Sequence, residues 1–313
     1  MTKLEECRVE RLDNSASARD GHWRCRTDSR HALDHEAIGR YVLSRRTPQG
    51  GYSYYRTPEW RVEEPSAPDT LAALESLRLL GIEPPEHGTT AEWLRQLQDD
   101  AGGYPSLTIG WGALRSLALL DAQPKRSPRT WLSDLGLPGS KSTHRTNSRG
   151  MLRDLLHVLQ LSRLVGTELH DEKSRVSLVL HEARNERGGW ASPGPELATS
   201  AVAIKVALLC ELKPEHPETL GVFVRNCEDR DLGFRLSPTG RATSVEAIWG
   251  GLEVLRALEL KPSYPQAIAT NLALTQRPDG GVGKRHRALT TLQATWIGLD
   301  ADRLLALTEQ EQP

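Results

Sequence analysis

The side chains best suited to bind an anion lie near the C-terminus of the sequence. A Pro-Asp-Gly-Gly stretch is followed by a basic run of Lys284, Arg285, His286 and Arg287, and Arg235 and Arg241 stand before the preceding apolar segment. Arg and Lys at helix N-termini bind phosphate groups through charge-assisted hydrogen bonds. The pattern therefore predicts an anion site of the phosphate type, and the alternative is a solvated charged loop.

Three tryptophans could hold an apolar ligand. Trp111, Trp249 and Trp296 each stand three residues before a leucine in an apolar helical segment. If this face is open to a cavity, the rings would contact a hydrocarbon chain or stabilise a cation through their π faces. The alternative is that they fill the space between two layers of helices.

Polar residues at the starts of the same helices offer weaker candidates for catalysis. Glu246 and Gln293 lie three residues before Trp249 and Trp296, one helical turn nearer the basic run. Glu246 suits a general acid or base, or simply a charge on the first helical turn. Asp69 opens another apolar segment, where a helix cap is the alternative to a catalytic role.

These candidates belong to a repeat. Gly-Gly-aromatic turns or weaker copies of them recur, and their second glycines lie 52, 86, 44 and 48 residues apart, at Gly51, Gly103, Gly189, Gly233 and Gly281. The interval of 86 residues corresponds to two periods, with a degenerate unit around residues 137–150. A short helical segment precedes each turn, and a longer apolar helix follows it from Asp69, Thr199, Thr243 or Thr290.

Six helical hairpins predict an all-α fold. We expect residues 34–313 to form a single α/α toroid, an α6–α6 barrel of six helical hairpin repeats, and residues 1–33 to form an irregular N-terminal arm across the ring closure. The inner helices read as apolar nearly all round, as in an enclosed ring. An open helical array is the alternative.

The turns carry a resemblance to a known superfamily. The stretch from Gln276 to Gly281, QRPDGG, resembles the Q-x-x-D-G-G-W turn of the terpenoid cyclases and protein prenyltransferases, and the likeness covers about residues 34–305. It implies a toroid whose lumen accepts an isoprenoid chain, with diphosphate at the basic run. The cyclase D-x-D-D acid is absent, and the transferase zinc ligands would fall near Ala242, Ser244 and Thr291, none of them suitable.

The resemblance therefore implies a ligand class more firmly than a reaction. We expect a prenyl diphosphate or similar amphiphile in the lumen, with a transferase or cyclase activity that uses neither zinc nor D-x-D-D. No cofactor is expected, apart from Mg²⁺ that a diphosphate would bring. The alternative is a catalytically inactive toroid that binds a ligand or a protein, and the sequence leaves catalysis open.

Composition limits the other partners. The net charge of -1 gives no general attraction to nucleic acid, and the longest apolar run, AVAIKVALLCEL, is too short to span a bilayer. Without a leader-like N-terminus, we expect a cytoplasmic protein, and the excess of Arg over Lys suggests a bacterial genome rich in GC. Residues 123–149 read as a long basic loop that could act as a lid or contact a protein partner, and the alternative is a surface insertion without a function.

Overall fold

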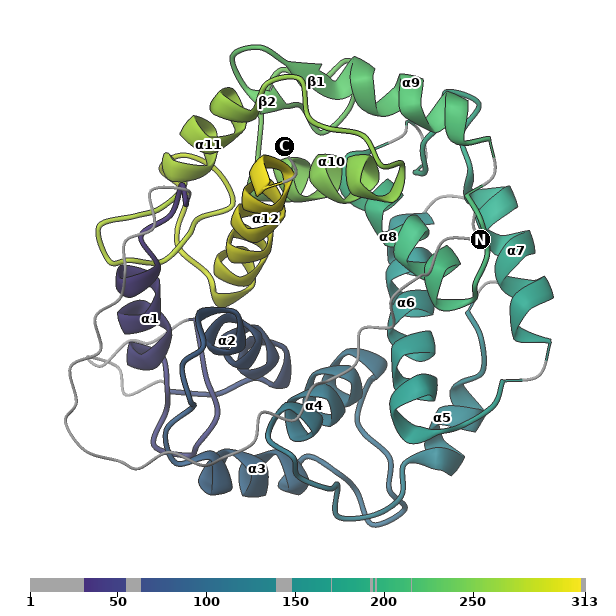
Figure 1. Ribbon diagram of the computed structural model, residues 1–313. Coiled ribbons are helices and arrows are strands. Elements are labelled where there is room, and N and C mark those ends of the chain that lie inside the picture. The colour runs from purple at the N-terminus through teal and green to yellow at the C-terminus, as the bar shows by residue number, and fades with distance from the viewer. Residues whose placement is uncertain are drawn as a thin grey trace.

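Two concentric rings of helices make up the molecule (Figure 1). The structure is a computed structural model that describes residues 31–54, 63–138, 148–169, 171–191, 194, 196–214 and 216–310. The outer ring comprises α1 (His35–Ser44), α3 (His87–Gln96), α5 (Arg129–Leu135), α7 (Glu172–Ala183), α9 (Pro217–Cys227) and α11 (Pro265–Ala273). The inner ring comprises α2 (Ala67–Leu80), α4 (Leu107–Leu119), α6 (Ser148–Val165), α8 (Leu197–Leu209), α10 (Val245–Ala257) and α12 (Leu292–Gln310).

The inner ring is closed. Each inner helix packs against the next one in the chain, and α12 packs against α2 (Figure 1). The predicted toroid of six hairpins is therefore confirmed, and the open array is wrong. Most of the predicted N-terminal arm, residues 1–30, lies outside the described residues. Of the rest, Ala32 donates its backbone N–H to Asp302 Oδ1 on α12, at 2.8 Å.

Glycine turns join the outer helix to the inner helix in five of the hairpins, while the connection from α5 to α6 lies largely outside the described residues. In the fifth hairpin the turn forms a short antiparallel ladder between β1 (Glu228–Asp229) and β2 (Gly233–Phe234). Three other turns make the equivalent single bridge, between residues 46 and 52, 184 and 190, and 276 and 282. The first glycine needs a positive φ, which is 89° at Gly280, and only glycine adopts this conformation without strain. The recurring glycines are therefore structural.

The residue that begins each of these turns also ties one hairpin to the next. Gln98 exchanges hydrogen bonds with the backbone of Arg126, accepting from its N–H at 2.8 Å and donating to its carbonyl at 2.9 Å. Gln276 makes the same pair of bonds to Asp34, at 2.8 and 3.0 Å. Because Asp34 directly precedes α1, Gln276 links the last turn to the first helix and closes the outer ring.

The inner helices begin close to the predicted positions, with different caps. Asp69 does not cap α2: the cap is Ser66, whose hydroxyl accepts a hydrogen bond from the Asp69 backbone N–H. Ser244 caps α10 in the same way. The prediction for α2 was wrong because Pro68 extends the helix upstream of Asp69, since proline is favoured in a first helical turn.

Close backbone contact holds neighbouring inner helices together. A Cβ placed on Gly250 of α10 would lie 2.7 Å from the Ala198 nitrogen of α8. The aromatic residues that follow the glycine turns fill the layer between the two rings, where Tyr52 and Phe234 are completely buried. The fold thus uses the repeat's glycines and aromatics for packing, which leaves other side chains to define a site.

The segment 123–149 is not one long loop. It contains α5, so this part of the prediction was wrong, and residues 139–147 lie outside the described part of the chain. Pro128 stands at the N-cap of α5, where it starts a helix rather than preventing one. Among the described residues, no helix combines the length and the hydrophobicity needed to cross a membrane.

Candidate functional site

The three predicted tryptophans gather on the inner ring. Trp111 of α4 and Trp296 of α12 have ring centroids 6.5 Å apart, although α2 lies between these helices in the ring. Two helices that are not neighbours can meet in this way only on the side facing the ring axis, which we call the lumen. Trp111 and Trp296 therefore face the lumen, where they cover α2.

Other polar and aromatic groups extend this tryptophan surface around the ring. Trp111 stacks on His157 of α6, with ring centroids 4.0 Å apart, and donates its indole N–H to Gln160 at 2.8 Å. Trp249 of α10 donates its indole N–H to Asp300 of α12 at 3.0 Å. We call Trp111, Trp249 and Trp296 the tryptophan belt. It lies one helical turn inside the N-terminal ends of the inner helices.

His157, which stacks on Trp111 of the tryptophan belt, is neutral. Burial, together with the positive charges of Arg153 and Arg115, lowers the pKa of His157 from 6.5 to about 3. Its Nδ1 has no hydrogen-bond partner among the described residues. A base with so low a pKa is a poor proton acceptor at neutral pH, so His157 serves as a flat, uncharged surface against Trp111.

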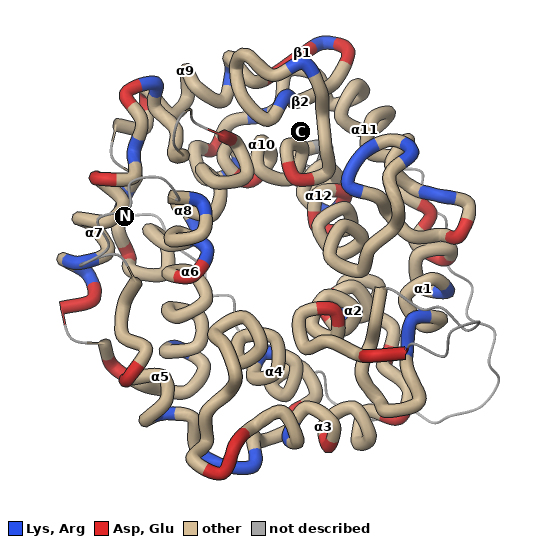
Figure 2. Tube along the Cα trace, turned by 180° about the vertical axis from the view of Figure 1, so that it is seen from behind, with Lys and Arg blue, Asp and Glu red and all other residues tan. Residues whose placement is uncertain are grey.

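A ring of charged residues lies one turn below the tryptophan belt. The ninth residue of five inner helices is charged, and these residues are Glu75, Arg115, Lys205, Glu253 and Asp300. Glu75 pairs with Arg115 across α2 and α4, and Glu253 pairs with Lys205 across α10 and α8. Charged residues therefore occupy the inner helices as well as the outer surface (Figure 2). The expectation that these helices are apolar nearly all round was wrong.

Three further arginines continue this charged ring by one turn. Arg78, Arg256 and Arg303 each follow a carboxylate of the ring by three residues and bind it, at 2.8 Å in each case. Their side chains are about half exposed, whereas those of Glu75 and Glu253 are only 4% exposed. Five cations thus accompany three carboxylates, a local net charge of +2. We call these eight residues the charged girdle, and its charge favours an anion in the lumen.

The predicted basic run lies at the N-terminal rim of the inner ring. The Lys284 carbonyl accepts a hydrogen bond from the Val245 backbone N–H at the start of α10, at 3.0 Å. The Lys284 ammonium pairs with Glu246 at 2.8 Å, so the structure brings these two predicted residues together. Arg285 and Arg287 are exposed and form no ion pair with the rest of the described chain.

Other predicted residues are placed differently. Arg235 is held by its own loop: it donates to the carbonyls of Asn226 and Pro238, each at 3.0 Å. His286 hydrogen-bonds the Leu274 carbonyl at 3.0 Å, which anchors the basic run. Arg241 and Gln293 are exposed at the rim. Of the predicted anion ligands, Arg235 is the one whose guanidinium is already committed to backbone carbonyls.

Asp69 sits near this rim without joining the basic run. Burial raises the pKa of its carboxyl, while the hydrogen bond with Ser66 acts in the opposite direction. Its Oδ2 lies 3.5 Å from the backbone nitrogen of Tyr54. The surroundings of Asp69 are those of a helix start, which gives it a structural role in the turn before α2.

The zinc positions implied by the resemblance do not fit a metal. Ser244 and Thr291 use their hydroxyls to cap α10 and α12, accepting from Ala247 and Ala294 at 3.1 and 3.0 Å. Ala242 has no donor atom. Zinc requires nitrogen, sulfur or carboxylate ligands, so these three positions do not fit a zinc ion.

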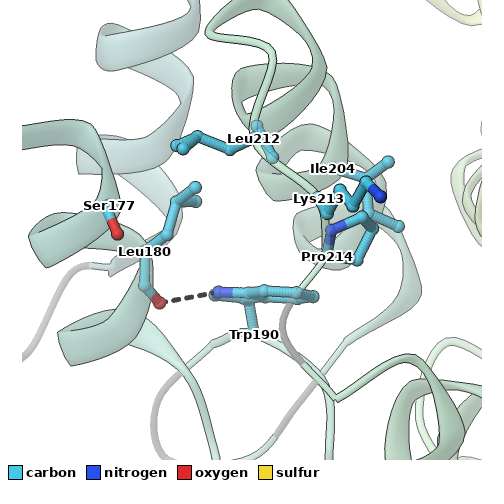
Figure 3. Close-up of a pocket in the computed structure, with 8 residues that line it drawn as sticks. Ser177, Leu180, Trp190, Ile204, Leu212, Lys213 and Pro214 are labelled. Atoms are coloured by element: carbon cyan, nitrogen blue, oxygen red, sulfur yellow. Dashed lines mark hydrogen bonds between the residues drawn. The ribbon is translucent and has the colours of Figure 1, made fainter. Parts of the chain in front are cut away.

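A small cavity lies outside the lumen. It has a volume of about 120 Å³ and is lined by residues of α7, α8 and the following loop, among them Leu180, Ile204 and Lys213 (Figure 3). Trp190 forms one wall and donates its indole N–H to the Leu180 carbonyl at 2.9 Å. Ligand pockets usually exceed about 300 Å³. This cavity is therefore a packing gap between the two rings, too small for an amphiphile.

The sequence contained a signal for the charged girdle that single helices do not reveal. Three inner helices share the pattern Leu, acidic, two residues, Arg: LESLR from Leu74, LEVLR from Leu252 and LDADR from Leu299. Aligned on the repeat, the acidic residues fall at the same helical position. An apolar helix with one internal ion pair looks ordinary alone, and only the comparison between repeats identifies a ring.

Comparison with solved structures supports the architecture. The chain resembles protein geranylgeranyltransferase-I of Candida albicans complexed with GGPP, with a TM-score of 0.66 and 14% identity over 87% of this chain and 91% of that one. It also resembles the type II terpene cyclase MstE from Scytonema, with a TM-score of 0.55 and 13% identity over 88% and 97% of the two chains. The chain has the α/α toroid fold of the protein prenyltransferases and terpenoid cyclases.

A third similar structure is a protein from Actinoplanes, with a TM-score of 0.51 and 18% identity over 87% of this chain and 100% of that one. No family model and no curated protein sequence matches the chain. At these identities the toroid is shared as a fold, and fold alone does not assign a reaction.

Proposed function

We propose that this toroid binds an amphiphilic anion of the isoprenoid diphosphate type in its lumen. The observation that carries the proposal is the tryptophan belt, whose rings are partly exposed. Trp111 and Trp296 face the lumen, and Trp249 lies one turn inside α10, whose first residue contacts the basic run. An apolar chain would lie against Trp249 and Trp296, one turn below Glu246 and Gln293. The solved transferase that this chain resembles contains GGPP, which makes the same ligand class a natural first candidate.

The anionic end of the ligand is assigned to the rim. Arg285, Arg287 and Arg241 are exposed there, and Lys284 adds a fourth cation. Arginine binds phosphate oxygens in a bidentate manner, and the N-terminus of α12 adds a favourable dipole. Any Mg²⁺ that accompanies a diphosphate would be held mainly by phosphate oxygens, with Glu246 as the carboxylate beside the basic run.

A second candidate function is ligand binding without catalysis, and the ion pairs of the carboxylates favour it. Glu75, Glu253 and Asp300 each pair with one or two cations, and Glu246 pairs with Lys284. A carboxyl group must be protonated to act as a general acid, and its carboxylate must be free of cations to act as a general base. A transferase or cyclase reaction would need one of these pairs to open when the ligand enters, whereas a binding toroid would not.

Calorimetric titration with farnesyl and geranylgeranyl diphosphate tests the proposal. We expect binding of one molecule, quenching of tryptophan fluorescence, and weaker binding by Arg287→Ala and by Trp296→Ala. The control is Arg187→Ala, an exposed arginine in the equivalent turn of the fourth hairpin. Failure of both diphosphates to bind would refute the proposal, as would equal binding by Arg287→Ala and Arg187→Ala. Product analysis after prolonged incubation separates an enzyme from a binding protein.

The proposal places the protein in the cytoplasm, where isoprenoid diphosphates are made and used. Cys210 and Cys227 are free, buried thiols, as expected of a reducing compartment. Burial raises the pKa of each thiol to about 12, so neither is a nucleophile at neutral pH. A protein partner at residues 123–149 is a separate hypothesis, which a pull-down with the wild-type chain and with a variant that replaces the exposed Lys125 and Arg126 by alanine would test.

A further inference from the structure

A cluster of two histidines and one aspartate lies at the seam where the ring closes. His31 Nδ1 is 2.9 Å and His35 Nε2 is 2.7 Å from the same oxygen, Oδ2 of Asp302. The donor atoms of all three side chains lie within 4.8 Å of one another. We propose that His31, His35 and Asp302 bind a divalent transition-metal ion, such as Zn²⁺, that fastens the start of the toroid to its last helix.

The charge balance around Asp302 is the first argument. Four carboxylates are buried in the described part of the chain, and three of them pair with arginine or lysine: Glu75, Glu228 and Glu253. Asp302 is completely buried, and its ion-pair partners among the described residues are the two histidines alone. A buried carboxylate needs a compensating positive charge, which a metal ion would supply permanently.

The contact between the two imidazoles is the second argument. Their ring centroids are 4.3 Å apart, and one nitrogen of each ring points at the same carboxylate oxygen, Oδ2 of Asp302. Three donor atoms from two histidines and one aspartate therefore converge on one point, and these residue types are the ligands that zinc uses in three-ligand protein sites.

The geometry needs little adjustment. Metal–nitrogen and metal–oxygen bonds of about 2.0–2.2 Å place tetrahedral ligand atoms about 3.3–3.6 Å apart. The histidine nitrogens lie 2.9 and 2.7 Å from Asp302 Oδ2, and all three donor atoms lie within 4.8 Å of one another, so shifts of less than about 1 Å would open the space for an ion. The Ala32 backbone N–H donates to Asp302 Oδ1, which turns Oδ2 toward the histidines, as outer hydrogen bonds do in metal sites. The histidine side chains are 29% and 27% exposed, so water can reach the fourth coordination position.

The position of the cluster indicates a structural role. His31 and Asp302 are 271 residues apart in sequence, and the cluster joins the segment before α1 to α12. Asp302 lies two residues beyond Asp300 and therefore on nearly the opposite side of α12 from the girdle. The metal would thus bind between the rings and not in the lumen, and it would act beside the contact between Gln276 and Asp34.

Metal titration of the full chain, freed of its purification tag and stripped with a chelator, tests the proposal. We expect one equivalent of Co²⁺ to produce visible absorption bands of a nitrogen–oxygen site, and Zn²⁺ to displace it. Zn²⁺ should also raise the melting temperature by several degrees, since a ligand that binds only the folded state stabilises it. These readouts do not depend on the proposed lumen ligand.

Variants of the two partly exposed histidines make the test specific. His31→Ala and His35→Ala should each weaken Zn²⁺ binding by more than about 100-fold, because even outer-shell changes cost 10- to 100-fold, and should abolish the rise in melting temperature. His87→Ala, at an exposed histidine outside the cluster, should bind Zn²⁺ as the wild-type chain does. Absence of stoichiometric binding to the wild-type chain would overturn the proposal, as would equal binding by the His35→Ala and His87→Ala variants.

Discussion

The buried histidine of the lumen makes the stability of the toroid depend on pH in a way that one substitution should remove. His157 has a pKa of about 3 in the folded chain, against 6.5 in an unfolded one. Between these two values the unfolded chain binds a proton that the folded chain does not. The free energy of unfolding therefore rises with pH in this window, and stability falls as the pH drops below 6.5.

The size of the effect follows from the two pKa values. At pH 7 the unfolded imidazole is mostly neutral, so the penalty is small. At pH 5 the pH lies about 1.5 units below the pKa of the unfolded imidazole, and each unit corresponds to about 1.36 kcal/mol. Lowering the pH from 7 to 5 should therefore cost about 2 kcal/mol through His157 alone.

The substitution His157→Phe keeps a flat ring against Trp111 and removes the titrating group. We expect urea unfolding, followed by circular dichroism, to give a stability loss between pH 7 and pH 5 about 2 kcal/mol smaller than in the wild-type chain. His87→Phe is the matched control, since His87 is exposed, and it should keep the wild-type loss. Equal losses of stability in the wild-type and His157→Phe chains would show that the His157 imidazole is already protonated in the folded chain at pH 5.

Three further substitutions test the packing, the girdle and the seam by chemical denaturation. Gly250→Ala should lower the free energy of unfolding by about 1–3 kcal/mol because the new Cβ would overlap α8. Its control is Gly221→Ala, which has open space around it in α9 and should raise the free energy of unfolding by up to about 1 kcal/mol. Equal effects of the two substitutions would contradict the close approach of α10 to α8. Glu75→Gln should lower the free energy of unfolding by about 3 kcal/mol, because it leaves Arg115 without its buried carboxylate partner. The double variant Glu75→Met, Arg115→Met should recover much of this lost stability. Gln276→Ala removes two hydrogen bonds that close the outer ring and should cost about 2 kcal/mol; an unchanged unfolding midpoint would show that the seam does not depend on them.

The repeat made the fold predictable. A glycine with positive φ has few substitutes, so the turns that contain Gly50, Gly102, Gly188 and Gly280 stay visible in the sequence. Their spacing fixes the number of hairpins, and six hairpins close into a ring. Helix starts were less predictable because several residues near each start can cap it, as Ser66 does in place of Asp69.

The candidate site was only partly predictable, because its parts come from different helices. The tryptophans could be found, since a large aromatic residue at a repeated position is rare, but the partners of Trp111 on α6 and α12 depend on ring closure. The girdle required the repeats to be compared in register. The seam cluster had no local pattern, because His31 and Asp302 come together only when the two ends of the chain meet.

The basic run combines a structural backbone with available side chains, and this makes it the best place to test function separately from stability. The Gly283 N–H donates to the Thr275 carbonyl, the Lys284 carbonyl accepts from Val245, and the His286 ring bonds the Leu274 carbonyl. The exposed guanidiniums of Arg285 and Arg287 take no part in these bonds. Replacing either arginine by alanine should therefore leave the unfolding midpoint unchanged, so that any loss of ligand binding reports on the anion site itself. By contrast, Gln276, only a few residues earlier, contributes to ring closure. Its substitution would lower stability as well as any ligand binding, so the two losses could not be separated.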